Sequence, residues 1–285
     1  MKVKHFFDSD TFTLTYVIYD EETLEGIVID PVLDFDPLTG SIYEKNVHQL
    51  VSFLKSNNIE LLAILETHAH ADHLSGSQSL KKIFPTAKIG IGESIKIVQD
   101  TFKGYFHLKH LKTDGSQFDF LLKDFEKIKF GSLEMTAIPT PGHTPACMSF
   151  LFQNVVFTGD ALFMPDYGTG RCDFPKGSAK TLYDSIIKNL YVLPDQTKVY
   201  VGHDYMPSGR EMKFETTIGE SKANNIHLRE NTSENDYIQL RENRDKGLSA
   251  PRLLLPSIQV NIDAGSLPPV EENGKSYLKI PLELK

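Results

Sequence analysis

The most informative segment is Thr67-His68-Ala69-His70-Ala71-Asp72-His73-Leu74-Ser75-Gly76, which follows the apolar run from Leu61 to Leu65. That run has the length and composition of a short buried strand. Four side chains that can bind a metal fall within the six residues that begin at His68. In extended backbone, residues two apart point the same way, so His68 and His70 can converge, and a turn into the next helix can direct Asp72 and His73 to a second point. Imidazole and carboxylate together suit zinc, iron or manganese.

Three further candidate ligands each follow a predicted strand. They are His143 in Thr-Pro-Gly-His-Thr-Pro, Asp160 in Phe-Thr-Gly-Asp-Ala and His203 in Val-Gly-His-Asp-Tyr. Ligands at the ends of several strands are typical of a site built on loops above a rigid sheet. A single loop histidine is usually solvated, but the joint pattern rarely arises without a metal. The other histidines receive no role: His5, His48, His107, His110 and His227.

Hydrophobic periodicity predicts alternating strands and helices along the chain. Strands at 13–19 and 26–30 form a hairpin, and helices span 46–57, with Asn46 as N-cap, and about 75–84. Further strands cover 87–91, 133–137, 148–152, 155–158 and 198–201, and Ser178 opens an amphipathic helix that contains Leu182, Ile186 and Leu190. Two late helices are expected near 217–229 and 233–246. We expect one α/β domain over 1–285, with residues from about 247 to 285 as an extended C-terminal tail packed on it.

Composition limits the function classes. The 285 residues carry 30 Lys+Arg against 38 Asp+Glu, a formal net charge of -8, so binding to nucleic acid or to a membrane surface is not expected. The two cysteines, Cys147 and Cys172, exclude a disulfide scaffold and a four-cysteine zinc site, and their roles stay open. The chain start does not resemble a signal peptide, and we expect a cytoplasmic enzyme. A homodimer is left open.

The motifs T-H-A-H-A-D-H, P-G-H-T, G-D-A and G-H-D, in this order, resemble the metallo-β-lactamase superfamily from about Thr13 to His227. The resemblance implies a four-layer αβ/βα sandwich: two β-sheets packed face to face, helices outside, and metals at one edge.

Within the superfamily, the chain more closely resembles the persulfide dioxygenases (sulfur dioxygenases), relatives of glyoxalase II. The supporting segments are Gly-Arg-Cys-Asp-Phe at 170–174 and Gly-His-Asp-Tyr at 202–205. The longer stretch 164–175 and the segment 250–257 resemble the β-lactamase hydrolase-like subgroup. Two positions depart from the family pattern: Cys172 replaces threonine, and Ala146 stands where glycine is usual.

This resemblance implies one iron(II) per chain, bound by His68, His143 and Asp160. Two histidines and one carboxylate leave open positions of the kind that non-haem iron oxygenases use. The substrates would be O2 and glutathione persulfide, giving sulfite and glutathione. Arg171 is a candidate partner for a substrate carboxylate or the oxidised sulfur, against a structural ion pair with Asp173 or Asp166. Tyr205 is a candidate hydrogen-bond donor to substrate.

Two alternatives remain open. A glyoxalase II-type hydrolase acting on a glutathione thioester would bind two Zn²⁺ ions. Asp72, His73 and His203 could hold the second ion, Asp160 could bridge the two, and His70 is a further adjacent or second-site candidate. The sequence shows no separate helical substrate domain with a basic glutathione clamp, which counts against this reading. A metal-stabilised regulatory protein is the nonenzymatic alternative, but a structural site would be closed by four ligands.

Overall fold

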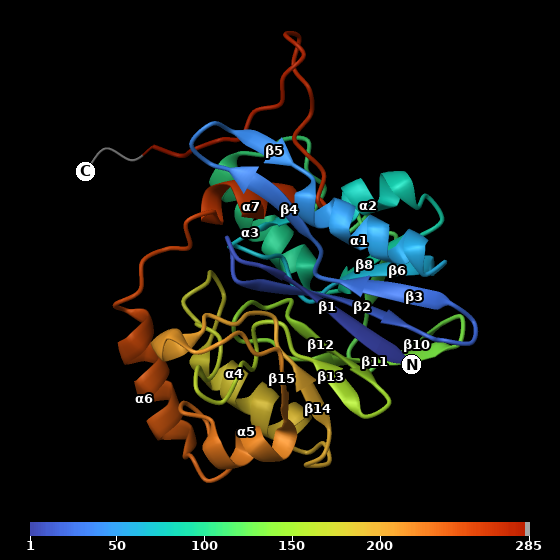
Figure 1. Cartoon of the computed structure of the whole chain (residues 1–285). Helices are drawn as coiled ribbons and strands as arrows, with labels where there is room; N and C mark the ends of the chain where they lie inside the picture. Colours follow the sequence, from blue (N-terminus) through green and yellow to red (C-terminus); the bar gives the residue numbers. More distant parts are fainter. Residues whose placement is uncertain (283–285) are drawn as a thin grey trace.

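Two six-stranded sheets form the centre of the protein in the computed structural model, which describes residues 1–282. The first has the order β1-β2-β3-β6-β8-β9 and the second the order β10-β11-β12-β13-β14-β15. A small sheet, β5-β4-β7, lies beside the first. Helices α1, α2 and α3 lie outside the first sheet and α4 and α5 beside the second (Figure 1). The expected four-layer αβ/βα sandwich is therefore confirmed.

The strands have the following bounds. The first sheet contains β1 (Lys2–Asp8), β2 (Thr13–Tyr19), β3 (Glu25–Ile29), β6 (Glu60–Glu66), β8 (Lys88–Gly92) and β9 (Phe120–Leu122). The second contains β10 (Lys127–Phe130), β11 (Leu133–Pro139), β12 (Met148–Phe152), β13 (Val155–Phe157), β14 (Lys198–Tyr200) and β15 (Glu215–Thr217). The small sheet contains β4 (Val32–Asp36), β5 (Ser41–Tyr43) and β7 (Leu74–Ser75).

The helices are α1 (Lys45–Ser56), α2 (Ser77–Ile83), α3 (Ile95–Phe106), α4 (Ala179–Ser185), α5 (Ile218–Asn224), α6 (Glu234–Asp245) and α7 (Leu254–Asn261). A π-helical turn, Ile186–Leu190, continues α4, and a 3₁₀ turn covers Pro207–Gly209. Among residues 1–282, none of these helices combines the length and the apolar composition that crossing a bilayer requires.

Side-chain alternation explains why the first sheet is buried on both faces. On β2, Tyr16 and Ile18 point into the core between the sheets, whereas Val17 packs into the cluster that includes residues of α1, α2 and α3. Strands β3, β6, β8 and β9 run parallel, and parallel strands are normally covered on both faces, here by the helices on one face and the second sheet on the other. The loops after β3 and β6 consequently leave the same edge of the sheet, and the metal-ligand candidates lie there.

Several predicted boundaries need correction. The first helix begins at Lys45 after Glu44, and the predicted N-cap Asn46 instead donates its side-chain amide to Asp34 Oδ1 at 2.7 Å. Leu74 and Ser75 pair with β4, which delays α2 to Ser77. Helix α3 was not predicted. Ser178 does cap α4, because its hydroxyl accepts a hydrogen bond from the Thr181 amide at 3.2 Å.

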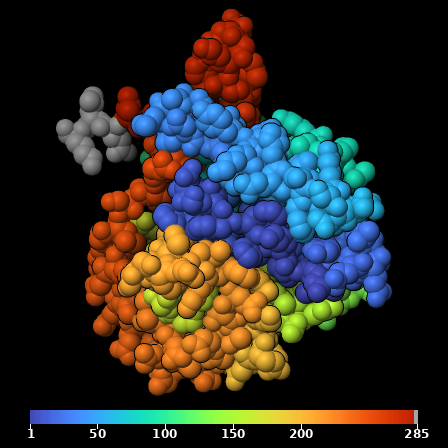
Figure 2. All heavy atoms as spheres, in the orientation of Figure 1, coloured from blue at the N-terminus to red at the C-terminus, as the bar shows by residue number. Residues whose placement is uncertain are grey.

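The prediction of an extended tail over residues 247–285 was wrong for its central part. Residues Leu254–Asn261 form α7, and the side chains of Ile258 and Val260 are completely buried against the first half of the chain. Figure 1 shows the chain leaving α6 in the lower half and rising to α7 beside β4 and α3. Beyond α7, the segment that follows projects from the top of the molecule (Figure 2). Residues 283–285 of the predicted tail lie outside the described part.

Candidate metal centre

The candidate ligands converge from four loops, each of which follows a strand. His68, His70, Asp72 and His73 follow β6, and the loops after β11, β13 and β14 supply His143, Asp160 and His203. Ligand atoms of His68, His143 and Asp160 lie within 4.8 Å of one another, and so do those of His70, Asp72 and His203. We call these the first group and the second group. All six side chains except that of Asp72 are buried.

Asp160 lies between the two groups. Its Oδ2 is 3.6 Å from His143 Nε2 and 4.0 Å from His68 Nε2, and its Oδ1 is 3.3 Å from His203 Nε2. One carboxylate therefore faces both groups, which is the position that a bridging ligand would take.

The four histidines 68, 73, 143 and 203 share one hydrogen-bonding pattern. Nδ1 of His143 donates to the carbonyl of Arg171 at 2.7 Å, and Nδ1 of His73 to the carbonyl of Leu74 at 3.0 Å. Nδ1 of His203 lies 3.3 Å from the carbonyl of Phe12. A carbonyl can only accept, so Nδ1 carries the proton and the lone pair is at Nε2, toward the site.

The Asp30 carboxylate fixes the same pattern at His68. Asp30 accepts from the amide of Thr67 at 2.7 Å and from its hydroxyl at 2.8 Å. That hydroxyl can therefore accept from His68 Nδ1, 3.0 Å away.

His70 is oriented the other way. Its Nε2 lies 3.0 Å from Asp30 Oδ1 and 3.3 Å from Glu66 Oε2, and within residues 1–282 both of its buried ring nitrogens lack a hydrogen-bond partner. Glu66 also accepts hydrogen bonds from the hydroxyls of Ser75 and Ser77. Two buried carboxylates thus face Nε2 of His70, and His70 also belongs to the second group with Asp72 and His203.

These side chains fit a metal because several of the polar atoms that face the site form no hydrogen bond within residues 1–282. Buried polar atoms normally have partners, and an exception calls for an explanation such as an ion. In the described part of the chain, the buried atoms without a hydrogen-bond partner include Nε2 of His68, His73 and His203, with Asp72 Oδ2 and Asp160 Oδ1. Imidazoles and carboxylates converge, and this donor set suits iron or zinc.

Electrostatics supports the same interpretation. Burial, followed by the neighbouring histidines, lowers the pKa of His68 well below its ordinary value, and burial lowers the pKa of His73 to about 4. Burial opposes protonation of His203 as well, but Asp72 and Asp160 outweigh it and raise the pKa of that residue. The carboxylates thus favour a positive charge at the second group, which a metal cation would supply.

A cavity of about 390 Å³ opens onto the ligands Asp72, His143 and Asp160. Its aromatic lining consists of Phe12, Phe163, Tyr167 and Tyr205, and its basic lining consists of Arg171, Arg241, Arg244 and Arg252. The volume is in the range of small-molecule sites, roughly 300 to 1,000 Å³.

The two proposed substrate-contacting residues both line this cavity. Tyr205 stacks on Tyr167 at 4.6 Å, and burial raises the pKa of its hydroxyl well above the ordinary value, so the hydroxyl keeps its proton. Arg171 is already paired: Nε lies 2.6 Å from Asp173 Oδ1, Nη2 lies 2.5 Å from Asp173 Oδ2, and Nη1 donates to the carbonyl of Ser249 at 2.8 Å. Its bidentate fork therefore faces Asp173, the structural pairing that the sequence left as an alternative.

Sequence reasoning missed several residues around the site. Arg244 and Arg252 line the cavity, and neither forms an ion pair within residues 1–282. Asn261 of α7 contacts the loop after β6, and His227, which received no role, accepts a hydrogen bond from the amide of Thr169 at 3.0 Å. The missing signal was long-range packing, since all four residues come from the last third of the chain.

Cys147 and Cys172 are buried, and burial raises the pKa of each thiol to about 12, which disfavours the reactive thiolate.

The sandwich with ligands at one edge defines a class of metal-binding proteins, and comparison of the sequence identifies the family. The profile of the metallo-β-lactamase superfamily matches residues 11–203. The chain belongs to this superfamily, as its motifs predicted.

Individual relatives carry different names. Glyoxylase B2 of Dictyostelium discoideum is 50% identical over 99% of this chain and 97% of its own. A β-lactamase hydrolase-like protein of Agrobacterium fabrum is 43% identical over 99% of this chain and 65% of its own. Human mitochondrial persulfide dioxygenase ETHE1 is 32% identical over 71% and 68%, respectively.

Among solved structures, ETHE1 from Myxococcus xanthus superposes with a TM-score of 0.76 at 30% identity, covering 93% of this chain and 100% of its own. The expected similarity to persulfide dioxygenases and to the hydrolase-like subgroup is thus confirmed.

Proposed function

We propose that the protein is an iron(II)-dependent persulfide dioxygenase that converts glutathione persulfide and O2 to sulfite and glutathione. The observation that carries the proposal is the first group, in which His68, His143 and Asp160 offer two imidazoles and one carboxylate around one point. This donor set is typical of non-haem iron(II) oxygenases. Similarity to ETHE1 proteins over most of the chain supports it.

The reaction balances with O2 as the only oxidant. The terminal sulfur gains both oxygen atoms of O2 and one oxygen of water, and it loses four electrons to O2. The S–S bond breaks, its electron pair stays on the inner sulfur, and that sulfur takes up a proton to become the thiol of glutathione. Two protons are released with the sulfite. A bound iron(II) would supply the electron transfer that lets O2 react with a sulfur atom.

Protein side chains would hold the substrate in the cavity. Within residues 1–282, Arg244 and Arg252 carry positive charges that form no ion pair, and glutathione has two carboxylates. Asp10 lines the same cavity and can accept from the ammonium group of the substrate. The hydroxyl of Tyr205 remains a donor, and Arg171 keeps two N–H groups beyond the three that Asp173 and Ser249 use.

A glyoxalase II-type hydrolase with two Zn²⁺ ions is the second candidate. The specific observation that favours it is the second group, His70, Asp72 and His203, next to Asp160. Two bound metals would supply an activated water for attack on a thioester carbonyl. The name Glyoxylase B2 on a relative that is 50% identical adds support.

The discriminating experiment offers both substrates to the same protein. Purified protein should consume one O2 for each sulfite formed from glutathione persulfide and should leave a glutathione thioester intact. The His143→Ala variant serves as the control and should take up no O2. Thioester hydrolysis without persulfide-dependent O2 uptake would favour the hydrolase.

A further inference from the structure

We infer that the segment from Asn225 to Asp245, beyond the residues that the superfamily profile matches, positions the metal ligand His143 through the loop 168–172. Arg241 and Asp245 of α6 are the main positioning residues. The inference rests on the proposed metal site, but it does not depend on which reaction that site supports.

The loop 168–172 reaches the site directly. The Arg171 carbonyl accepts the proton of His143 Nδ1 at 2.7 Å and so fixes both the tautomer and the plane of the ring. Gly170 packs so closely that a Cβ atom there would overlap the carbonyl oxygen of Asp160 and would lie 3.4 Å from the Cβ of His143. A shift of this loop would therefore move two of the three members of the first group.

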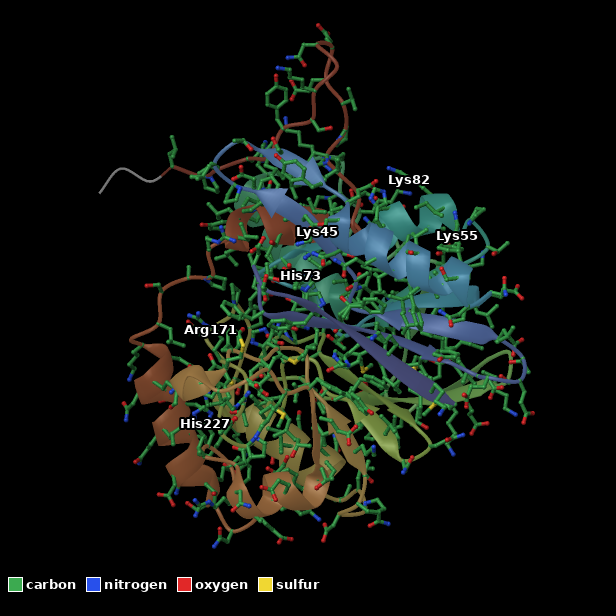
Figure 3. All side chains as sticks on the ribbon, in the orientation of Figure 1. Lys45, Lys55, His73, Lys82, Arg171 and His227 are labelled. Carbon is green, nitrogen blue, oxygen red and sulfur yellow. The ribbon has the colours of Figure 1, made fainter. Side chains whose placement is uncertain are left out.

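Helix α6 fixes the loop at two points. Asp245 Oδ2 accepts from the amide of Cys172 at 2.8 Å, and Arg241 Nη1 donates to the carbonyl of Thr169 at 2.9 Å. Arg241 Nη2 also pairs with Asp245 Oδ1, so the two linked side chains bind the backbone on both sides of Arg171. Arg171 lies on the α6 side of the molecule, as does His227 (Figure 3).

Three more contacts come from the same part of the chain. His227 Nδ1 accepts from the amide of Thr169 at 3.0 Å, and the Tyr237 hydroxyl lies 2.9 Å from that of Thr169. The side-chain amide of Asn225 donates to the carbonyl of Gly168 at 3.0 Å. The loop thus forms five hydrogen bonds to residues 225–245, and the Arg171 carbonyl of this loop orients His143.

The burial of the ion pair argues for a positioning role. Arg241 is 1% exposed and Asp245 is 6% exposed, and Arg241 Nε has no hydrogen-bond partner among residues 1–282. Replacing a buried ion pair with apolar residues often leaves stability unchanged or raises it, so stability alone is a weak reason for keeping one. Its contacts with the loop provide a specific reason, because each charged side chain forms a hydrogen bond to a backbone group of the segment that orients a metal ligand.

Cobalt(II) binding to the full chain, freed of metal beforehand, tests the inference without reference to activity. The double variant Arg241→Met/Asp245→Leu removes both charges together and leaves neither unpaired. Arg241→Lys keeps the charge opposite Asp245, but it loses the planar fork that joins Asp245 to Thr169. Leu54→Ala is the matched control, because Leu54 is fully buried in α1 and belongs to the core cluster on the helix side of the first sheet.

We expect the tighter cobalt ion to bind at least about tenfold more weakly to both α6 variants, the range found when hydrogen-bond partners that orient metal ligands are lost. Leu54→Ala should lower the melting temperature but keep wild-type cobalt affinity. Wild-type affinity in both α6 variants would overturn the inference, as would an equal loss of affinity in Leu54→Ala. Absence of cobalt binding by the wild-type protein would instead refute the metal site itself.

Discussion

The side-chain amide of Asn261 lies 2.7 Å from the carbonyl oxygen of His73 and donates a hydrogen bond to it. The same amide donates to the carbonyl of His70 at 2.8 Å, and Oδ1 of Asn261 accepts from the amide of Ser75 at 2.8 Å. Helix α7 therefore holds the loop that carries four of the candidate ligands, although it lies almost two hundred residues further along the chain.

We expect Asn261→Ala to destabilise the protein and to weaken metal retention. The substitution leaves three buried backbone groups without partners, at a cost of about 1–3 kcal/mol for each. Thermal unfolding and metal analysis would measure both effects. Asn261→Asp is the control, because it keeps an acceptor for Ser75 but loses both donated bonds, so it should show most of the metal loss. Unchanged metal content in both variants would show that α7 does not support the site.

His73→Ala and His203→Ala distinguish one metal from two. A mononuclear dioxygenase should keep one iron per chain in either variant, because neither residue belongs to the first group. Its activity should fall only through indirect effects on the ligands. A two-metal hydrolase should lose one metal and most of its rate when His203, a member of the second group, is removed. Metal-to-protein ratios by elemental analysis decide the matter, and loss of one of two bound metals would contradict the mononuclear proposal.

Arg244→Gln/Arg252→Gln should raise KM for glutathione persulfide about tenfold and leave kcat nearly unchanged. Each exposed ion pair with a substrate carboxylate is worth about 0.5–1 kcal/mol after solvent screening. Arg171→Lys should lower kcat/KM by less than the loss of a bidentate contact to substrate would, because the guanidinium of Arg171 already binds Asp173. Arg229→Gln is the matched control, because Arg229 is exposed but does not line the cavity. An equal rise in KM for a simple alkyl persulfide, which has no carboxylates, would argue against these two contacts.

Stability should fall in acid partly through His227. Burial, together with Arg241 and Arg244, lowers the pKa of His227 from 6.5 to about 3. The unfolded chain therefore binds a proton that the native protein does not, and the resulting loss of stability grows as pH falls from about 6.5 toward 3. His227→Asn does not titrate and keeps an acceptor for Thr169. Urea unfolding at pH 7 and pH 4.5 should show a smaller acid loss in this variant. The same loss in both proteins would show that His227 is protonated in the native state.

The site was predictable to the extent that its ligands belong to local motifs at strand ends. His68, Asp160 and His203 each follow a short apolar strand, and the edges of packed sheets bring such loops together. The helix start at Lys45 was misplaced because Asn46 is bound by Asp34, a tertiary contact that overrides local preference. Helix α7 was missed for a related reason. It contains Pro256 and is almost wholly buried, so it lacks an amphipathic pattern.

The residues that position the candidate ligands could not be predicted from the sequence. Asn261, Asp245 and Arg241 act through hydrogen bonds to backbone groups. Every residue type has such a backbone group, so the sequence does not show which one a side chain will bind. The fork of Arg171 is a similar case, because only the three-dimensional arrangement shows that Asp173 occupies it.

The most direct test of the central claim is the metal content of the full chain, purified without added metal and assayed at once for O2 uptake with glutathione persulfide. The proposal predicts one iron per chain and uptake that rises in proportion to iron occupancy. Two zinc ions per chain, with thioester hydrolysis and no persulfide-dependent O2 uptake, would contradict it.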